Sequence, residues 1–175
     1  MERERLDVQV LIVGAGPAGL ATALRLAQLF EQHNQEIDAG TRPGEKFSTE
    51  DICILEKGKE IGAHLLSGAV LDPRSLRELL PDFDQPGSPE AAPLACPVKR
   101  DAVYYLTENG QWKFPILPPF FRNHGNYIVS LNRLGRWMGQ KVEAAGVTVF
   151  TGFSGKEILY ENGAVVGVRT EDKGL

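Results

Sequence analysis

Hydrophobic residues near the N-terminus form a short run that leads into a glycine-rich turn. The run, Val8 to Val13, reads Val-Gln-Val-Leu-Ile-Val, and the turn covers Gly14 to Gly19. Short β-branched runs bounded by turns are typical of buried parallel strands. After the turn, apolar residues recur at the i, i+3 and i+4 positions of a helix face. These residues are Leu20, Ala23, Leu24, Ala27 and Phe30. The pattern predicts strand, turn and helix, which together open a βαβ unit.

A second apolar run, Ile52 to Leu55, predicts the next parallel strand. Between it and the helix lies a polar stretch, His33 to Asp51, which contains two glycines and a proline. Segments of this composition are typical of loops. We therefore predict a solvated insertion at residues 34–50 that contributes nothing to the core.

The middle of the chain is predicted to hold one short helix and two irregular segments. Asp72 followed by Pro73 is typical of a helix start, and Pro81 predicts its end. Four prolines between Phe83 and Pro97 predict a loop. The segment from Pro115 to Arg122, rich in proline and phenylalanine, predicts a second irregular stretch.

The rest of the chain predicts a longer helix, a third strand and two hairpins. An apolar face with helical spacing runs from Leu131 to Ala145, and Gly146 predicts the helix end. Val147 to Phe150 predicts a third parallel strand. Asn-Gly pairs predict the hairpin turns. The hairpins are residues 102–107 with 111–114, and 157–160 with 165–169.

These elements predict an α/β fold, a Rossmann-like FAD/NAD(P)-binding βαβ unit with parallel strands plus antiparallel β-hairpins. A length of 175 residues suits one domain. Three parallel strands are fewer than a complete flavoprotein fold needs, so the sequence predicts an incomplete one.

The glycine-rich turn has the G-x-G-x-x-G spacing of dinucleotide-binding proteins, between a strand and a helix as that motif requires. Gly14 permits the tight turn, Gly16 leaves room for the pyrophosphate, and Gly19 lets helix and strand pack closely. The N-terminus of the following helix favours phosphate groups. The predicted cofactor-binding residues here are Val13, Gly14, Ala15, Gly16, Pro17, Ala18 and Gly19.

Glu56 is the candidate ligand of the adenosine ribose. The motif places an acidic residue at the end of the second strand, about 20 residues after the turn. Glu56 lies 37 positions after Gly19, and removing the 17 residues of the insertion restores the expected spacing. Lys57 follows where a 2′-phosphate would more often meet Arg, which disfavours NADP and leaves FAD and NAD open. Small residues at 62–64 and 67–69 predict backbone lying against a flat ring.

Composition excludes several other classes of function. A net charge of −4 without a basic cluster argues against a nucleic-acid partner. The two cysteines, Cys53 and Cys96, fit no metal-binding spacing, and an iron–sulfur cluster needs four protein ligands. We predict no metal site, no signal peptide and no transmembrane helix in this chain, so membrane contact would be peripheral or monotopic.

Several motifs together resemble the electron-transfer flavoprotein:ubiquinone oxidoreductase family, over nearly the whole chain. They are Val13–Leu20, Glu56-Lys57, Ile61–Pro73, Asn123–Val129 and Trp137–Gly139. The resemblance implies an FAD enzyme of the inner mitochondrial or bacterial cytoplasmic membrane. Such an enzyme passes electrons from reduced electron-transfer flavoprotein to ubiquinone through FAD and one [4Fe–4S] cluster. No catalytic acid, base or nucleophile is expected, because the cofactor carries the redox chemistry.

The resemblance also implies roles for single residues. The glycine turn, Glu56 and Lys57 would hold the ADP half of FAD. Gly62, Ser67 and Gly68 would approach the flavin half. The membrane and quinone side would include Leu76, Leu79, Leu80 and Phe83, unless these residues simply cover the core. Many relatives have Arg where this chain has Ser130, so a flavin contact at that position is in doubt, and His64 is expected to pack rather than to catalyse.

The family's quinone-facing domain and cluster cysteines are expected to lie outside these residues. On this interpretation residues 1–175 are the N-terminal part of an FAD-binding domain. Two alternatives stay open. One is an FAD-dependent reductase or monooxygenase of the geranylgeranyl-reductase type, which would be expected to lack the Ile61–Pro73 run. The other is an inactive truncated FAD-binding fragment.

Overall fold

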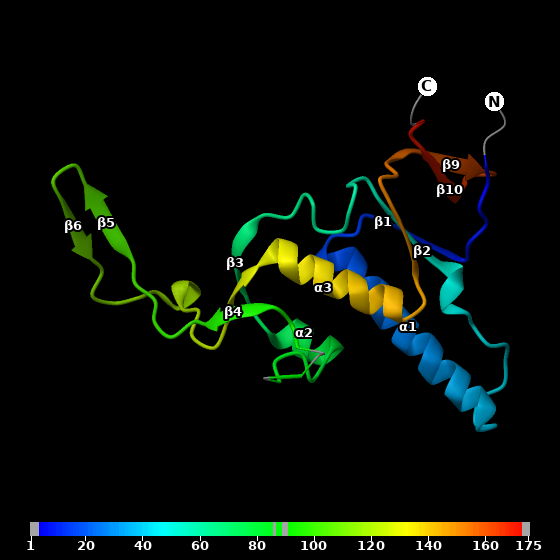
Figure 1. Ribbon diagram of the computed structural model, residues 1–175, viewed down its shortest axis with the longest axis horizontal. Helices are drawn as coiled ribbons and strands as arrows, with labels where there is room; N and C mark the ends of the chain where they lie inside the picture. Colours follow the sequence, from blue (N-terminus) through cyan, green and yellow to red (C-terminus); the bar gives the residue numbers. More distant parts are fainter. Residues whose placement is uncertain (1–3, 86, 89–90, 173–175) are drawn as a thin grey trace. The chain divides into compact units, whose positions relative to one another are not determined.

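The computed structural model describes residues 4–85, 87–88 and 91–172 (Figure 1). It divides into two compact units. The first contains the residues up to Leu65 together with those from Gly135 onward, and the second contains Leu66–Leu134.

A parallel three-stranded sheet organises the first unit. Its strands are β1 (Val10–Val13), β2 (Ile52–Glu56) and β8 (Thr148–Thr151), in the order β1-β2-β8. The first four residues of β2 are buried, as expected of a central strand covered on both faces. All three predicted parallel strands are therefore confirmed.

Two helices supply most of the remaining core of the first unit. In α1 (Pro17–Asp38) the buried residues are Leu20, Ala23, Leu24 and Ala27, which are four of the five residues of the predicted apolar face, and the fifth, Phe30, is half-buried. In α3 (Leu131–Ala144), which begins in the second unit, the first-unit core residues are Trp137, Met138 and Val142. Gly146 follows α3 with a φ of +86°, as expected of a glycine that ends a helix.

The structure differs from the loop predicted at residues 34–50. Helix α1 continues to Asp38, and a short 3₁₀ turn (Thr49–Asp51) precedes β2. Beyond the helix end, the chain folds back so that the Phe47 ring stacks on Phe30 at 4.8 Å. Side chains at i and i+4 hydrogen-bond along the helix, as where the Gln32 amide donates to the Glu36 carboxylate, and favour its extension.

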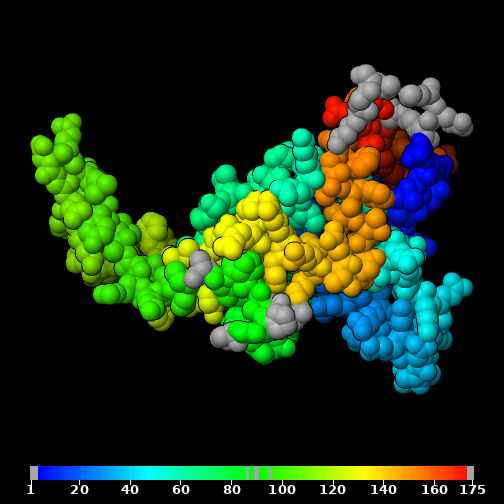
Figure 2. Space-filling model, in the orientation of Figure 1, coloured from blue at the N-terminus to red at the C-terminus, as the bar shows by residue number. Residues whose placement is uncertain are grey.

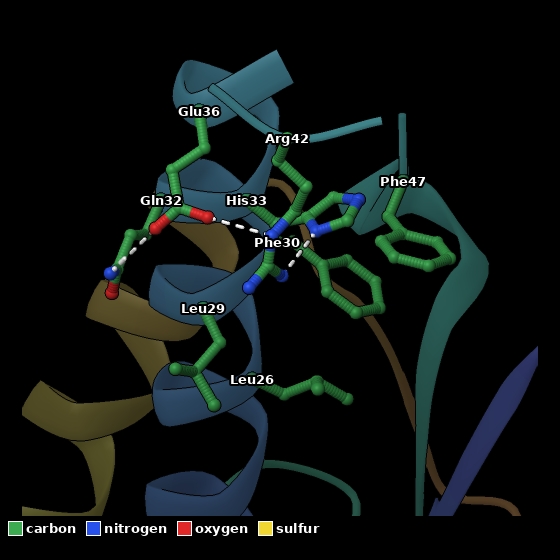
Figure 3. A pocket seen from close by; sticks show the side chains of 8 residues that line it. All are labelled: Leu26, Leu29, Phe30, Gln32, His33, Glu36, Arg42 and Phe47. Carbon is green, nitrogen blue, oxygen red and sulfur yellow. Dashed lines mark hydrogen bonds and ion pairs between the residues drawn. The ribbon is translucent and has the colours of Figure 1, made fainter. Parts of the chain in front are cut away.

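The end of α1 and this returning segment enclose a surface hollow of about 300 Å³ (Figure 3). The Asn34 side chain bonds both the N–H and the carbonyl of Phe47, at 2.9 and 2.7 Å. Arg42 lies 3.0 Å from Nδ1 of His33 and forms an ion pair with Glu36 at 2.8 Å. The polar groups of the hollow are thus engaged with one another.

A β-hairpin completes the first unit. Its strands are β9 (Gly155–Glu161) and β10 (Ala164–Thr170), and Asn162 and Gly163 in the turn have φ values of +50° and +80°. Positive φ at both turn residues is what a tight hairpin requires. The hairpin predicted from Asn162-Gly163 is confirmed.

An antiparallel sheet forms the centre of the second unit. It consists of β3 (Ser67–Leu71), β7 (Tyr127–Ser130) and β4 (Leu94–Pro97), with β7 in the middle. The predicted helix after Pro73 is α2 (Arg74–Leu79). Strand β7 was not predicted from the sequence, and β4 lies in a segment that was predicted to be a loop. Proline is tolerated at the end of an edge strand, which explains Pro97 in β4.

The predicted central hairpin is also confirmed, as β5 (Tyr104–Thr107) and β6 (Gly110–Lys113). Every residue of its two strands is exposed, and the hairpin extends from its unit (Figure 2). A 3₁₀ turn (Pro119–Phe121) follows in the segment predicted to be irregular.

Candidate dinucleotide-binding site

The glycine turn joins the end of β1 to the start of α1. Gly14 has a φ of +107°, and its N–H donates to the carbonyl of Leu55 in β2 at 2.7 Å. Helix α1 begins at Pro17, and Gly16, its N-cap, provides no side-chain hydrogen bond. The first turn of α1 therefore presents backbone N–H groups that no capping side chain covers, which suits an anionic ligand.

The glycines of the turn differ in what a side chain would meet. A Cβ on Gly16 would have nothing within 4 Å, so the space beside the turn is open. A Cβ on Gly19 would overlap the carbonyl oxygen of Gly14 and come within 3.3 Å of Ile12. Gly16 thus leaves room for a ligand, whereas Gly19 permits close packing of helix and strand. Both arrangements fit the pyrophosphate of a dinucleotide.

Glu56, at the end of β2, reaches the glycine turn. Its carboxylate accepts hydrogen bonds from the N–H of Ala15 at 2.8 Å and of Gly58 at 2.6 Å. Only 13% of the side chain is exposed, and Nδ1 of His64 lies 3.9 Å away. The predicted acid and the predicted phosphate turn are therefore adjacent. The hydrogen bond to Ala15 was not predicted, because the motif assigns this acid only to the ribose.

The neighbourhood of Glu56 leaves little room for side chains. A Cβ on Gly58 would lie 3.0 Å from the Glu56 carboxylate and 3.3 Å from His64. The chain at the end of β2 is hydrogen-bonded to the residues that follow β8. The N–H of Gly152 donates to the carbonyl of Gly58, and the N–H of Phe153 donates to the carbonyl of Glu56. Lys57 is exposed beside them. These bonds fix the carboxyl edge of the sheet, where α/β folds bind ligands.

Two glycines of α3 allow the segment that follows Glu56 to pack closely against the helix. A Cβ on Gly139 would come within 2.5 Å of the Ile61 side chain, and one on Gly135 within 2.6 Å of Leu65. Two motifs of the sequence resemblance, the one starting at Ile61 and the one ending at Gly139, therefore pack together. The Nε1 group of buried Trp137 has no hydrogen-bond partner among the described residues.

The residues predicted to approach the flavin lie in both units. Gly62, with a φ of +84°, is buried in the first unit. Ser67 and Gly68 are exposed on β3 of the second unit, where Ser67 lies opposite Ser130 of β7. Gly68 has a φ of +81° and open space at its Cβ position. Their contact with a flavin stays a prediction.

The four residues predicted for a membrane or quinone side are placed differently from one another. Leu76 and Phe83 are 6% and 1% exposed and belong to the core of the second unit. Leu79 and Leu80 are half-buried. Phe83 packs edge-on against Tyr127, with ring centroids 6.3 Å apart. Among the described helices, none is long and apolar enough to cross a bilayer.

The cysteines of the described chain have separate environments. Cys53 is buried in β2, and burial raises the pKa of its thiol, whereas Cys96 is exposed on β4. In the described ranges, no three His, Cys, Asp or Glu side chains come together as metal ligands.

Comparison with solved structures identifies the fold. A geranylgeranyl bacteriochlorophyll reductase-like protein from Thermoplasma acidophilum is 22% identical with a TM-score of 0.59, covering 94% of this chain and 34% of its own. The myxobacterial chondrochloren halogenase, an FAD-dependent halogenase, is 20% identical with a TM-score of 0.57, covering 96% of this chain and 34% of its own. The chain thus has the fold of part of an FAD-dependent oxidoreductase or halogenase, as predicted.

Sequence comparison finds relatives within the class of FAD-dependent oxidoreductases, although no family model matches the chain. Electron transfer flavoprotein-ubiquinone oxidoreductases are 46% identical in Bos taurus and 44% identical in Pseudomonas aeruginosa, each over the whole chain. The mitochondrial protein of Dictyostelium discoideum is 44% identical over 99% of the chain. The chain spans 26–29% of the length of these relatives. The resemblance to the electron transfer flavoprotein-ubiquinone oxidoreductases is therefore confirmed for about a quarter of such a protein.

Proposed function

We propose that this chain binds FAD within an oxidoreductase that takes electrons from reduced electron-transfer flavoprotein and passes them to ubiquinone. The observation that carries the proposal is the 2.8 Å hydrogen bond between Glu56 and Ala15, which joins the predicted ribose ligand to the predicted phosphate turn. The names of the relatives support the donor and the acceptor. By the same resemblance, a [4Fe–4S] cluster would be held by residues outside this chain.

The residues present suit the ADP half of FAD. The N–H groups at the start of α1 would bind the pyrophosphate, and the open space at Gly16 would admit it. The Glu56 carboxylate keeps lone pairs for the ribose hydroxyls beyond those used by Ala15 and Gly58. Bound FAD would supply the electron transfer itself. The protein's part is to bind and orient the cofactor.

We propose further that the second unit contacts a membrane without crossing it, through residues 104–121, here called the aromatic arm. Large apolar side chains of the arm are exposed: Tyr104, Tyr105, Leu106, Trp112, Phe114, Ile116, Phe120 and Phe121. Water-exposed apolar groups gathered in this way mark interaction surfaces, and tyrosine and tryptophan are enriched at membrane interfaces. The arm supports the membrane contact better than Leu76 and Phe83, which are buried.

A reductase of the geranylgeranyl type is the second candidate. The Thermoplasma structure shares the fold, but its 22% identity carries no statement about activity. The relatives at 44–46% identity favour electron-transfer flavoprotein as the donor.

Flavin binding and electron transfer test the proposal in two stages. The chain is incubated with FAD and passed through gel filtration, and we expect a stoichiometric flavin absorbance band to remain with it. Loss of the band would contradict FAD binding and support an inactive fragment. Anaerobic mixing of the loaded chain with reduced electron-transfer flavoprotein should then bleach the bound flavin. A loaded chain that stays oxidised contradicts the proposed donor alone.

A further inference from the structure

The segment around the aromatic arm carries positive charge in an acidic protein. Residues 98–124 contain four cations and two acidic residues, whereas the whole chain has a net charge of −4. The cations are Lys99, Arg100, Lys113 and Arg122, and all four are exposed. We call these four residues the basic collar.

The two acidic residues of this segment offset only part of the charge of the basic collar. Asp101 accepts hydrogen bonds from the N–H and the side-chain amide of Asn123, at 2.9 and 3.1 Å. Glu108 lies in the turn of the hairpin, and Lys113 lies at the opposite, open end, across from Tyr104. In the part of the chain that the structure describes, none of the four cations forms an ion pair. Their charge is available to an external partner.

The hairpin register places three aromatic side chains on one face and Lys113 on the other, beside Tyr104. Tyr105 lies opposite Trp112, and Tyr104 lies opposite Lys113. Because side chains alternate along a strand, Tyr105, Trp112 and Phe114 share one face, with the Trp112 and Phe114 rings 4.9 Å apart. Lys113 projects from the other face, with Nζ 6.0 Å from the centre of the Tyr104 ring.

We propose that the basic collar binds the anionic headgroups of the membrane that the aromatic arm contacts. This inference rests on the proposed membrane contact and adds the chemistry of the lipid. A bilayer presents negative phosphates directly above hydrocarbon. In the chain, Lys113 and Arg122 follow or precede exposed apolar residues within three positions, among them Ile116 and Phe120, which are 76% and 79% exposed. An acidic protein would match the collar's charge without offering that apolar layer.

Binding to lipid vesicles can be measured by titrating the protein with vesicles and following its tryptophan fluorescence. Trp112 is 58% exposed and Trp137 is 9% exposed, so a Trp137→Phe background leaves one probe on the arm. That change removes no hydrogen bond within the described chain. The probes are vesicles of phosphatidylcholine alone and vesicles that also contain phosphatidylglycerol. In the test variant Lys113 and Arg122 become Gln, and in the control variant the exposed Lys59 and Lys156 become Gln.

Each interfacial cation is expected to strengthen binding to the anionic vesicles about fivefold. The test variant should therefore bind them about 25-fold more weakly than the control, with both unchanged on phosphatidylcholine. Added salt should shrink this difference. Equal affinity for both vesicles, or full retention of anionic binding by the test variant, overturns the headgroup proposal and leaves the membrane contact standing. Binding to neither vesicle overturns both and favours a protein surface as the partner of the arm.

Discussion

The glycine turn of the first unit and the aromatic arm of the second unit, the two proposed binding regions, differ in how far their groups contact the rest of the chain. In the glycine turn hydrogen bonds within the chain hold the backbone, because the N–H of Gly14 donates to the Leu55 carbonyl and the N–H of Ala15 donates to the Glu56 carboxylate. In the arm the large side chains are exposed, up to 79% at Phe120. A small anionic cofactor needs a fixed backbone, whereas a wide surface needs accessible side chains. Substitutions that break contacts of the first region should lower stability as well as binding, whereas substitutions in the second should change binding alone.

Replacing one phenylalanine of the core and one of the arm by alanine should give the largest difference in the free energy of unfolding. Phe83 is 1% exposed, so Phe83→Ala should lower the free energy of unfolding by about 3–5 kcal/mol. Phe120→Ala, at 79% exposure, should change it by less than about 0.5 kcal/mol. Urea unfolding followed by circular dichroism measures both. Equal losses would mean that the arm packs against the chain in solution.

Removing the Glu56 carboxylate should cost stability even without cofactor. Glu56→Ala leaves the N–H groups of Ala15 and Gly58 without their acceptor. Losing hydrogen bonds to a charged group should lower the free energy of unfolding by about 2–3 kcal/mol. Glu157→Ala is the control, because its ion pair with Arg169 is on the surface and should contribute less than about 1 kcal/mol. Amide exchange at Ala15 should accelerate only in the first variant, and unchanged protection there would count against this role.

Substitutions at Gly16 and Gly19 of the turn should separate the effect on packing from the effect on cofactor binding. A Cβ on Gly19 overlaps the Gly14 carbonyl, so Gly19→Ala should lower stability by about 1–3 kcal/mol. Gly16→Ala meets open space and should leave unfolding unchanged while weakening FAD binding at least tenfold, measured by quenching of flavin fluorescence. Gly110→Ala in the hairpin, with ordinary contact at 3.6 Å, is the matched control. Normal FAD affinity in Gly16→Ala would place the pyrophosphate elsewhere.

Sequence patterns predicted the parts of the fold where one residue type is physically required. Gly14 and the Asn162-Gly163 pair adopt positive φ values, and the buried strand β2 is continuously apolar. Other features depend on tertiary contacts that no local pattern contains. The extension of α1 accompanies the stacking of Phe47 on Phe30, and β4 forms because β7 pairs with it. The exposure of the arm could not be predicted either, because a strand that packs on a core has the same alternating aromatic pattern.

The smallest expected effect concerns acid stability of the second unit, away from the glycine turn. Arg77 hydrogen-bonds Asp84 at 2.7 Å and lowers the pKa of that carboxyl, with a weaker contribution from the Tyr127 hydroxyl at 3.3 Å. Because the pKa is lower in the folded chain, the ionised pair stabilises it above the ordinary aspartate pKa of about 4, and the contribution fades as the pH falls further. Asp84→Asn should therefore unfold more easily than the parent chain at neutral pH, and the difference should shrink toward pH ~3. A difference that stays constant with pH would show that packing of the side chain, rather than its charge, provides the stability.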